Sequence, residues 1–379
     1  MNPSRTRALW FGAVLAFSLP LLVLLATGYS ETGRQGLVSA MRMVLASLGA
    51  IEPPPDSDLL KLRLLRALCA VGVGGSLALA GAMTQGLFRN PLAEPGLLGL
   101  GSGAMLGAVI AIAVLGGYGP EFWTPSPDLS TSGGHAFISL GLIPICAFIG
   151  SMAASLTIYR MATRHGRISV PALLLIGLAI NSLLGALMAG IQVLLLQDWQ
   201  VSRAIVAWGF GTLDDRNTTH LAVVWTGAIL AILGIPFVGL ELDLLAGGED
   251  DAAGLGADPG RVKTVVLICV ALSTAASVSV AGQIAFVGLL VPHVMRMLIG
   301  PHHRSLLPIS FLAGAALLVG VVAFQHALCP ALSDWFAASG SATAARAFKR
   351  ITALQPGVLT SLLGAPCFIY LLLRQDKRW

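Results

Sequence analysis

Nine stretches of this chain contain no Asp, Glu, Lys or Arg, and each is longer than the roughly 20 apolar residues that a membrane-spanning helix needs. They cover residues 8–30, 67–88, 95–120, 129–159, 168–197, 217–240, 264–295, 305–333 and 351–373. As one helix, 264–295 would measure about 48 Å, which exceeds a hydrocarbon core of about 30 Å. We interpret it as a full helix near 264–281 and a shorter one near 284–299, which predicts ten spans, with nine as the alternative.

The composition supports a membrane protein. Charged residues make up 11% of the chain and apolar residues 56%, whereas a soluble domain has roughly 25% charged residues. A soluble enzyme and a disordered chain are therefore excluded. The net charge of +5 does not require nucleic acid, and none is expected as a partner, because membrane proteins collect Lys and Arg on cytoplasmic loops. The sequence predicts an all-α polytopic membrane protein.

The orientation follows from the first helix and the basic residues. The apolar run from Ala8 to Gly28 is longer than the usual 7–15 residues of a signal peptide, so we expect a retained helix. Ten spans place both termini on one side. With the termini inside, 13 of the 23 Lys and Arg residues lie on inside segments and 10 outside, which favours cytoplasmic termini.

The sequence contains no motif with which this chain could drive transport by itself. No predicted span has Asp or Glu near its centre, whereas ion-coupled transporters usually need such a group. None of the four lysines follows a glycine, so no phosphate-binding P-loop is present, and no metal site or bound cofactor is expected. The few polar residues in the spans are expected to form interhelical hydrogen bonds or to lie at the interface: Asn181, Gln192, His293 and Arg296. Active transport by this chain would need a partner to supply energy.

Two segments of the chain align when it is shifted by 201 residues. The aligned pairs are Ala70 with Ala271, Ser76 with Ser277, Ala80 with Ala281, Gly81 with Gly282, Pro91 with Pro292, and Gly99 with Gly300. Each copy has a small-residue helix, a glycine and a proline ten residues later. In a ten-span topology the two copies run in opposite directions, which predicts an inverted repeat.

Longer motifs carry a resemblance to a known family. They are LRLLR at 62–66, RNPLAEPG at 89–96, FVGLLVPH at 286–293, PGVLT at 356–360 and LGAP at 363–366. In this order they resemble the permease family of ABC importers for vitamin B12, ferric siderophores and haem. The resemblance covers nearly the whole chain from about residue 60.

The resemblance implies an architecture and a set of partners. It implies one transmembrane permease domain over 1–379, with halves of about 1–220 and 221–379, and a homodimer with the substrate path at its centre. It also implies two ATPase subunits that hold ATP and Mg on the cytoplasmic side, and one periplasmic binding protein. The chain would lie in a bacterial inner membrane and would not itself be an enzyme.

The resemblance also assigns roles to particular residues. Arg63 and Arg66 match two arginines that meet glutamates of the binding protein, and arginine forms bidentate pairs with carboxylates. The cytoplasmic gates are expected at Asn90, Pro91 and Leu92, and at Ser169 in the second gate. The segment 241–260 matches the part that docks into the ATPase, and its three consecutive acids at 249–251 predict the start of a short helix. Within it, we expect contacts from Glu249, Ala252, Leu255 and Gly256.

Some positions depart from the family pattern. An acid and an arginine near the end of the ninth helix are replaced by Val322 and His326, and an unusual segment follows at 329–351. We hypothesise that His326, Arg346 and Arg350 take over the missing docking contact. The Pro-, Gly- and Ser-rich segment 117–136 is expected to be a periplasmic loop.

The sequence leaves three substrates open. His326 and the extra basic cluster favour haem, followed by a ferric siderophore and then cobalamin. An ion-coupled secondary transporter and a non-transporting membrane scaffold remain the alternative classes.

Overall fold

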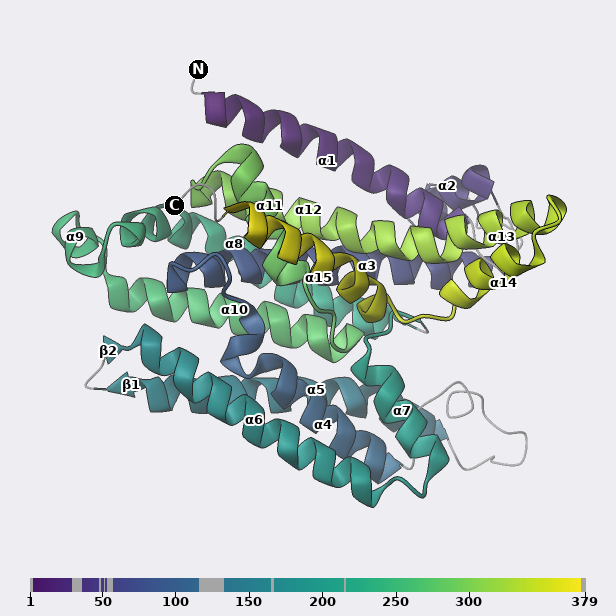
Figure 1. Ribbon diagram of the computed structural model, residues 1–379, viewed down its shortest axis with the longest axis horizontal. Coiled ribbons are helices and arrows are strands. Elements are labelled where there is room, and N and C mark those ends of the chain that lie inside the picture. Colours follow the sequence, from purple (N-terminus) through teal and green to yellow (C-terminus); the bar gives the residue numbers. More distant parts are fainter. Residues whose placement is uncertain are drawn as a thin grey trace.

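The computed structural model describes residues 3–28, 36–47, 49–50, 52, 57–115, 133–164, 167–214 and 216–375, and nearly all of them are helical (Figure 1). The strands among them form a two-residue hairpin, β1 (Thr163–Arg164) and β2 (Arg167–Ile168). Helices satisfy their own backbone hydrogen bonds, which the hydrocarbon core requires. Most of the predicted loop at 117–136 lies outside the described residues, and its last four residues already belong to a helix.

Ten helices lie at the nine charge-free stretches, because the stretch 264–295 holds two of them. They are α1 (Pro3–Gly28), α3 (Ser57–Phe88), α4 (Leu100–Leu115), α5 (Gly133–Ala162), α6 (Val170–Leu194), α8 (Thr218–Ala246), α10 (Pro259–Ala281), α11 (Val287–Ile299), α12 (His303–Ala323) and α15 (Pro356–Gln375). The long stretch 264–295 divides at Gly282, whose φ of +70° suits glycine. This stretch therefore forms two helices, as the division near 282 predicts.

The helices differ in their ability to cross a membrane. Within the described residues seven are long and apolar enough, and an eighth span results if α15 is joined to the preceding helix across a 103° bend. Helices α4 and α11 have 16 and 13 residues, or about 24 and 20 Å. Both are shorter than the hydrocarbon core, so a straight crossing by either helix alone is excluded. The polytopic all-α prediction is confirmed.

Shorter elements lie between these helices. They are α2 (Gly36–Ser47), η1 (Pro95–Leu98), α7 (Trp199–Gly209), α9 (Glu249–Gly254), the π-helical turn η3 (Phe324–Leu328), α13 (Cys329–Ala338) and α14 (Ala342–Ile351). The sequence predicted only α9 among them. In Figure 1 the hairpin α13–α14 projects at one end of the molecule, whereas α9 and the β-hairpin lie at the other. We call the first the arginine end, because Arg63 and Arg66 lie there, and the second the gate end, which holds residues 89–92.

The core is built around α3, which is packed by α8, α10, α11 and α12 and is buried along most of its length. Small residues allow the close approach, as is usual in membrane bundles. A Cβ atom at Gly81 would overlap the carbonyl oxygen of Gly288, and one at Gly74 would overlap that of Gly314. Backbones therefore touch directly at two levels of α3.

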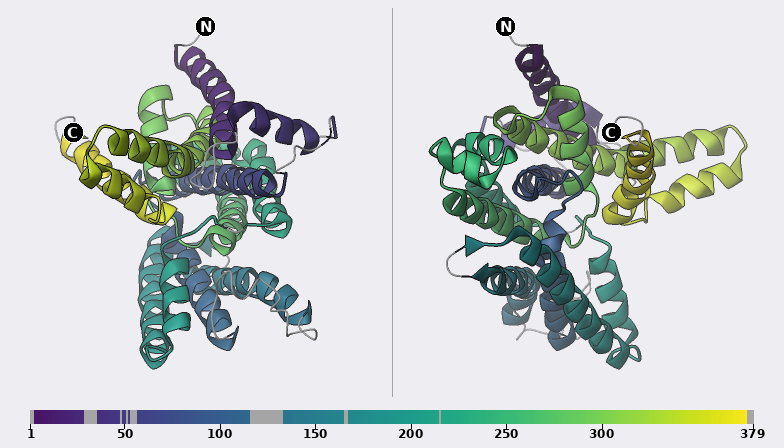
Figure 2. Two further views of the ribbon diagram at one scale, coloured as in Figure 1. Left: turned by 90° about the vertical axis from the view of Figure 1, so that its right-hand side faces the viewer. Right: turned by 60° about the vertical axis from the view of Figure 1, so that its left-hand side comes forward.

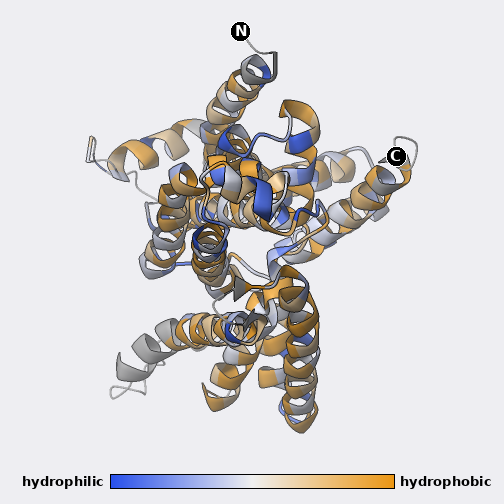
Figure 3. Ribbon diagram, turned by 90° about the vertical axis from the view of Figure 1, so that its left-hand side faces the viewer, coloured by the Kyte–Doolittle hydropathy of each residue, from blue (hydrophilic) through white to orange (hydrophobic). Residues whose placement is uncertain are grey.

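A second group of helices, α4 to α7, lies beside this core (Figures 1 and 2). Helices α4 and α5 also meet through glycines, with Gly103 against the backbone of Gly150 and Gly107 against that of Cys146. Figure 3 shows the molecule from the gate end: hydrophobic residues cover the outer helices, and hydrophilic ones gather in the loops that face the viewer. This distribution fits a bundle surrounded by lipid.

The two copies of the repeat, on α3 and α10, run in opposite directions, as the inverted repeat predicts. Helix α3 begins at the arginine end, whereas α10 begins at the gate end and finishes beside Thr212, whose N–H donates to Ala281 O at 2.8 Å. Their aligned glycines have different tasks, however. Gly81, in the middle of α3, permits the close contact between α3 and α11, whereas Gly282 permits the turn at which α10 ends.

Candidate functional site

The predicted first gate is a tight turn after α3. Asn90 Oδ1 accepts a hydrogen bond from the N–H of Leu92 at 2.9 Å, and Asn90 O accepts one from Ala93 N–H at 3.1 Å. Asparagine commonly closes a turn in this way, and proline fixes the backbone that follows. The preceding residue, Arg89, has a positive φ of 50°. The motif around Asn90 and Pro91 thus encodes a sharply reversed chain at the gate end.

The predicted second gate residue, Ser169, connects β2 to α6. Its Oγ accepts a hydrogen bond from Ala172 N–H at 3.4 Å, so it forms the N-cap of α6. The chain enters α6 directly from the β-hairpin. Any movement of the hairpin therefore acts on the start of that helix.

Glu249, on the first turn of α9, is the centre of an ion-pair network at the gate end. Its Oε2 lies 2.6 Å from Lys263 Nζ, and its Oε1 lies 3.8 Å from Arg89 Nη2. Lys263 also donates a hydrogen bond to Ile168 O at 3.0 Å. The side chain of Lys263 is only 7% exposed, which strengthens its electrostatic contact relative to a surface pair. Glu249 and Lys263 thereby join α9 to the Arg89 turn, to α10 and to the β-hairpin.

The network brings together segments that the sequence predicted separately. The two gates and the coupling segment are widely spaced in the chain, yet one carboxylate and one ammonium group link all three. Sequence analysis found Glu249 but missed Arg89 and Lys263 as its partners. Lys263 follows Glu249 by 14 residues and lies on a different helix, and no periodic sequence pattern predicts such a contact.

The other coupling residues are placed differently from one another. The side chain of Leu255 is 71% exposed, which is unusual for a leucine that does not lie on one of the long apolar helices. Gly256 follows it with a φ of +90° and turns the chain away. Ala252 is fully buried, so its side chain packs inside the segment and is not presented to a partner. Among the residues predicted for coupling, Leu255 is therefore the one that presents a large exposed apolar side chain.

At the arginine end, Asp214 gathers two of the predicted docking residues. Its Oδ1 lies 3.2 Å from Arg66 Nη2 and 3.8 Å from His326 Nε2. The aspartate side chain is 42% exposed, so the cluster is open to solvent. Arg63 is only 2% exposed and is not presented to a partner in this conformation. Sequence analysis did not single out Asp214, because it lies in a loop far from both partners in the chain.

The unusual segment 329–351 folds into the helical hairpin of α13 and α14. The rings of Phe336 and Phe348 stack with their centroids 5.4 Å apart, and Ser333 Oγ donates to Ala345 O at 3.0 Å. Arg346 and Arg350 are exposed on α14, and no ion pair joins either of them to another described residue. The hairpin thus presents two guanidinium groups at the arginine end.

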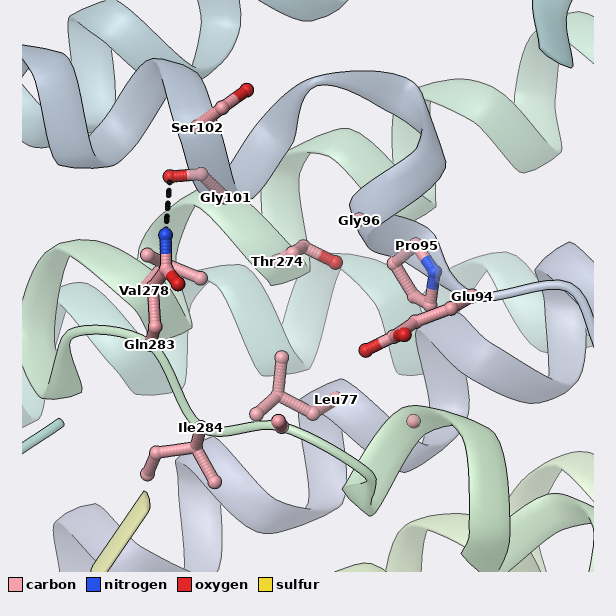
Figure 4. Close-up of a pocket in the computed structure, with 12 residues that line it drawn as sticks. Leu77, Glu94, Pro95, Gly96, Gly101, Ser102, Thr274, Val278, Gln283 and Ile284 are labelled. Carbon is pink, nitrogen blue, oxygen red and sulfur yellow. Dashed lines mark hydrogen bonds between the residues drawn. The ribbon is translucent and has the colours of Figure 1, made fainter. Parts of the chain in front are cut away.

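A carboxylate that belongs to no predicted span faces the inside of the bundle. Glu94 lines a cavity of about 240 Å³ with Leu77 of α3 and Thr274 of α10, and Figure 4 shows its carboxylate directed into that space. Leu77 lies about 16 Å before the end of α3 at Phe88. The connection after the gate turn therefore folds back along α3. The prediction concerned the spans alone, and Glu94 belongs to the connection between two of them.

Polar side chains also join the second group of helices to the core. Asn181 on α6 donates from Nδ2 to Gly96 O at 3.1 Å and accepts from Ser102 Oγ, so it makes the interhelical hydrogen bonds predicted for it.

Among the described residues, no group of three or more His, Cys, Asp and Glu side chains could hold a metal ion.

Comparison with known proteins assigns the chain to a family. Residues 21–333 match the FecCD transport family. The hemin transport system permease HmuU of Yersinia pestis is 36% identical over 96% of both chains. The cobalamin import system permease BtuC of Halobacterium salinarum is 36% identical over 84% of this chain and 73% of its own length. The iron-uptake system permease FeuC of Bacillus subtilis is 30% identical over 94% of this chain and 96% of its own length.

A solved structure shows the same fold. An inward-facing metal-chelate type ABC transporter superposes with a TM-score of 0.70, at 24% identity, over 97% of this chain and 99% of that one. The family match, the full-length relatives and this fold agree with the motifs at 89–96 and 286–293. The chain therefore belongs to the FecCD transport family and is a multi-pass permease of the ABC-transporter type.

Proposed function

We propose that this permease forms a homodimer that imports haem across a bacterial inner membrane, with energy from two partner ATPase subunits. The observation that supports haem is the 36% identity to a hemin permease over 96% of both chains. A cobalamin permease has equal identity over a shorter part, so cobalamin and ferric siderophores are the competing substrates. In this proposal the ATP and Mg stay on the partners.

The network at the gate end provides a route for coupling. We place the ATPase against exposed Leu255, so that closure of the ATPase dimer moves α9. Glu249 then pulls on Arg89 in the first gate turn, and Lys263 pulls on the β-hairpin that leads to Ser169. Import is a population shift between outward- and inward-facing states that ATP biases through these contacts.

The arginine end provides the surface for a periplasmic binding protein. A carboxylate of that protein would compete with Asp214 for Arg66, while Arg346 and Arg350 offer further positive charge from α14. Such charge pairs set the orientation of a docked partner and speed its association. Arg63 would join only after a rearrangement that exposes it.

Reversing two charges on α14 tests this surface. The double variant Arg346→Glu/Arg350→Glu is expected to raise the dissociation constant of the binding protein about tenfold or more, because attraction becomes repulsion. This constant is measured by surface plasmon resonance with the permease in nanodiscs. The matched control, Arg160→Glu/Arg261→Glu, reverses two exposed arginines at the gate end and should leave the affinity unchanged. Equal affinity of both doubles would contradict this docking surface.

The substrate is tested by uptake in a strain that lacks this permease and any redundant system. Haem, a ferric siderophore and cobalamin are supplied separately, with and without the restored gene. We expect the gene to restore haem uptake alone, and a partner ATPase without its P-loop lysine to abolish that uptake. Restoration of only one of the other two substrates would reassign the cargo, and uptake independent of the ATPase would contradict the mechanism.

A further inference from the structure

A second cavity, of about 420 Å³, lies at the gate end and has no role in the coupling route. The end of α3, the gate turn, α8, α11 and α12 surround it, and the charged or titratable side chains that line it are Arg89, His293, Arg296 and His303. By liquid volume it could hold roughly a dozen water molecules. It is thus large enough for a hydrated oxyanion, and its lining side chains include two guanidinium groups and no carboxylate.

Arg296 on α11 has unused hydrogen-bonding capacity at this cavity. Its Nε and Nη2 atoms are buried and have no hydrogen-bond partner among the described residues. Buried polar groups are normally satisfied, and a charged one is costly to leave without a partner. Two adjacent N–H groups of a guanidinium match two oxygens of a phosphate or carboxylate. Arg296 therefore presents a vacant site for an oxyanion.

Two carboxylates at the gate end are already engaged with other groups. Asp243 Oδ1 lies 2.6 Å from His303 Nδ1 and accepts the backbone N–H of His303 at 2.9 Å. Glu249 is held at 2.6 Å by Lys263, which leaves Arg89 at 3.8 Å, beyond normal hydrogen-bond distance. Neither carboxylate therefore makes a hydrogen bond to Arg89 or to Nε and Nη2 of Arg296.

We propose that this cavity binds a phosphate-type oxyanion between Arg296 and Arg89. Basic pockets between membrane helices on the cytoplasmic side commonly bind anionic lipid headgroups, and a free phosphate offers the same chemistry. The exposed side chain of Met297 at the cavity provides an apolar edge for an acyl chain. Because Arg89 also contacts Glu249, a bound anion would brace the gate turn and compete with the coupling helix for that arginine.

Thermal unfolding of the intact permease–ATPase complex in nanodiscs tests the site. In neutral phosphatidylcholine discs, sodium phosphate at constant ionic strength should raise the unfolding midpoint by a few degrees and saturate, whereas sodium chloride should not. Arg296→Gln should raise the half-saturating phosphate concentration about tenfold or more, since charged hydrogen bonds are lost. Arg296→Lys, which keeps the charge, should fold normally. Its half-saturating phosphate concentration should lie between those of the wild type and of Arg296→Gln.

The control and the lipid arm make the test decisive. Arg304→Gln removes an exposed arginine of α12 that does not line the cavity, and it should bind phosphate like the wild type. If discs with phosphatidylglycerol raise the midpoint and phosphate adds nothing, the headgroup is the ligand; if phosphate acts equally in both discs, the free anion is. Equal responses to phosphate and chloride, or unchanged binding in both Arg296 variants, would overturn the proposal. The readout is binding, so it is independent of which substrate the permease carries.

Discussion

Replacing Gly81 by alanine is expected to prevent the accumulation of folded permease. The added Cβ would overlap the backbone carbonyl of Gly288, and backbone cannot rotate away as a side chain can. Helices α3 and α11 would have to separate in the most buried part of the bundle. Overpacking of this kind costs about 3 kcal/mol or more, a large share of a typical folding free energy. The yield and unfolding midpoint of detergent-solubilised protein, measured by fluorescence-detected size exclusion, would show the loss.

A second glycine provides the matched control for Gly81. Gly320 lies on α12, and a Cβ at this position would meet nothing within 4 Å. Alanine is the better helix former, so Gly320→Ala should leave the midpoint unchanged or raise it, by up to about 1 kcal/mol in stability. Wild-type yield and midpoint for Gly81→Ala would show that the α3–α11 contact is looser than the structure has it.

The variant Glu249→Gln is expected to uncouple ATP hydrolysis from transport. An amide keeps an acceptor oxygen but carries no charge, so the ion pairs with Lys263 at 2.6 Å and Arg89 at 3.8 Å are lost and the tie from α9 to α10 and the gate turn is weakened. Because Glu249 is partly exposed, the loss in stability should be only about 1–2 kcal/mol, and the protein should still fold. We expect substrate transport in proteoliposomes to fall about tenfold while ATPase activity persists.

The neighbouring acid separates this role from general charge effects. Asp250 is exposed on the same short helix, and Asp250→Asn removes one negative charge without breaking the network. Its transport per ATP hydrolysed should match the wild type. Lys263→Met, which removes the other side of the close pair, should reproduce the defect of Glu249→Gln. Equal coupling in the Glu249 and Asp250 variants would show that the network does not carry the signal.

Local chemistry explains why much of the site could be predicted from the sequence. The turn at Asn90 and Pro91, the short helix at Glu249 and the break at Gly282 each depend on residues within a few positions. Asp214, Arg89 and Lys263 were missed as partners because each meets its counterpart across the fold. The hairpin α13–α14 was noticed only as an unusual sequence, since its ring stacking requires the folded structure.

The sequence by itself determined the places of ten apolar helices, the opposite directions of α3 and α10, and the family. It could do so because the hydrocarbon core excludes charge, which makes each helix visible as a local gap. Only the tertiary structure decided that Glu94 reaches a cavity beside Leu77 and that Arg63 is buried. It also decided that Glu249 and Lys263 together link the predicted coupling segment to both predicted gates. These features depend on distances between residues far apart in the chain, and such distances are set by helix packing.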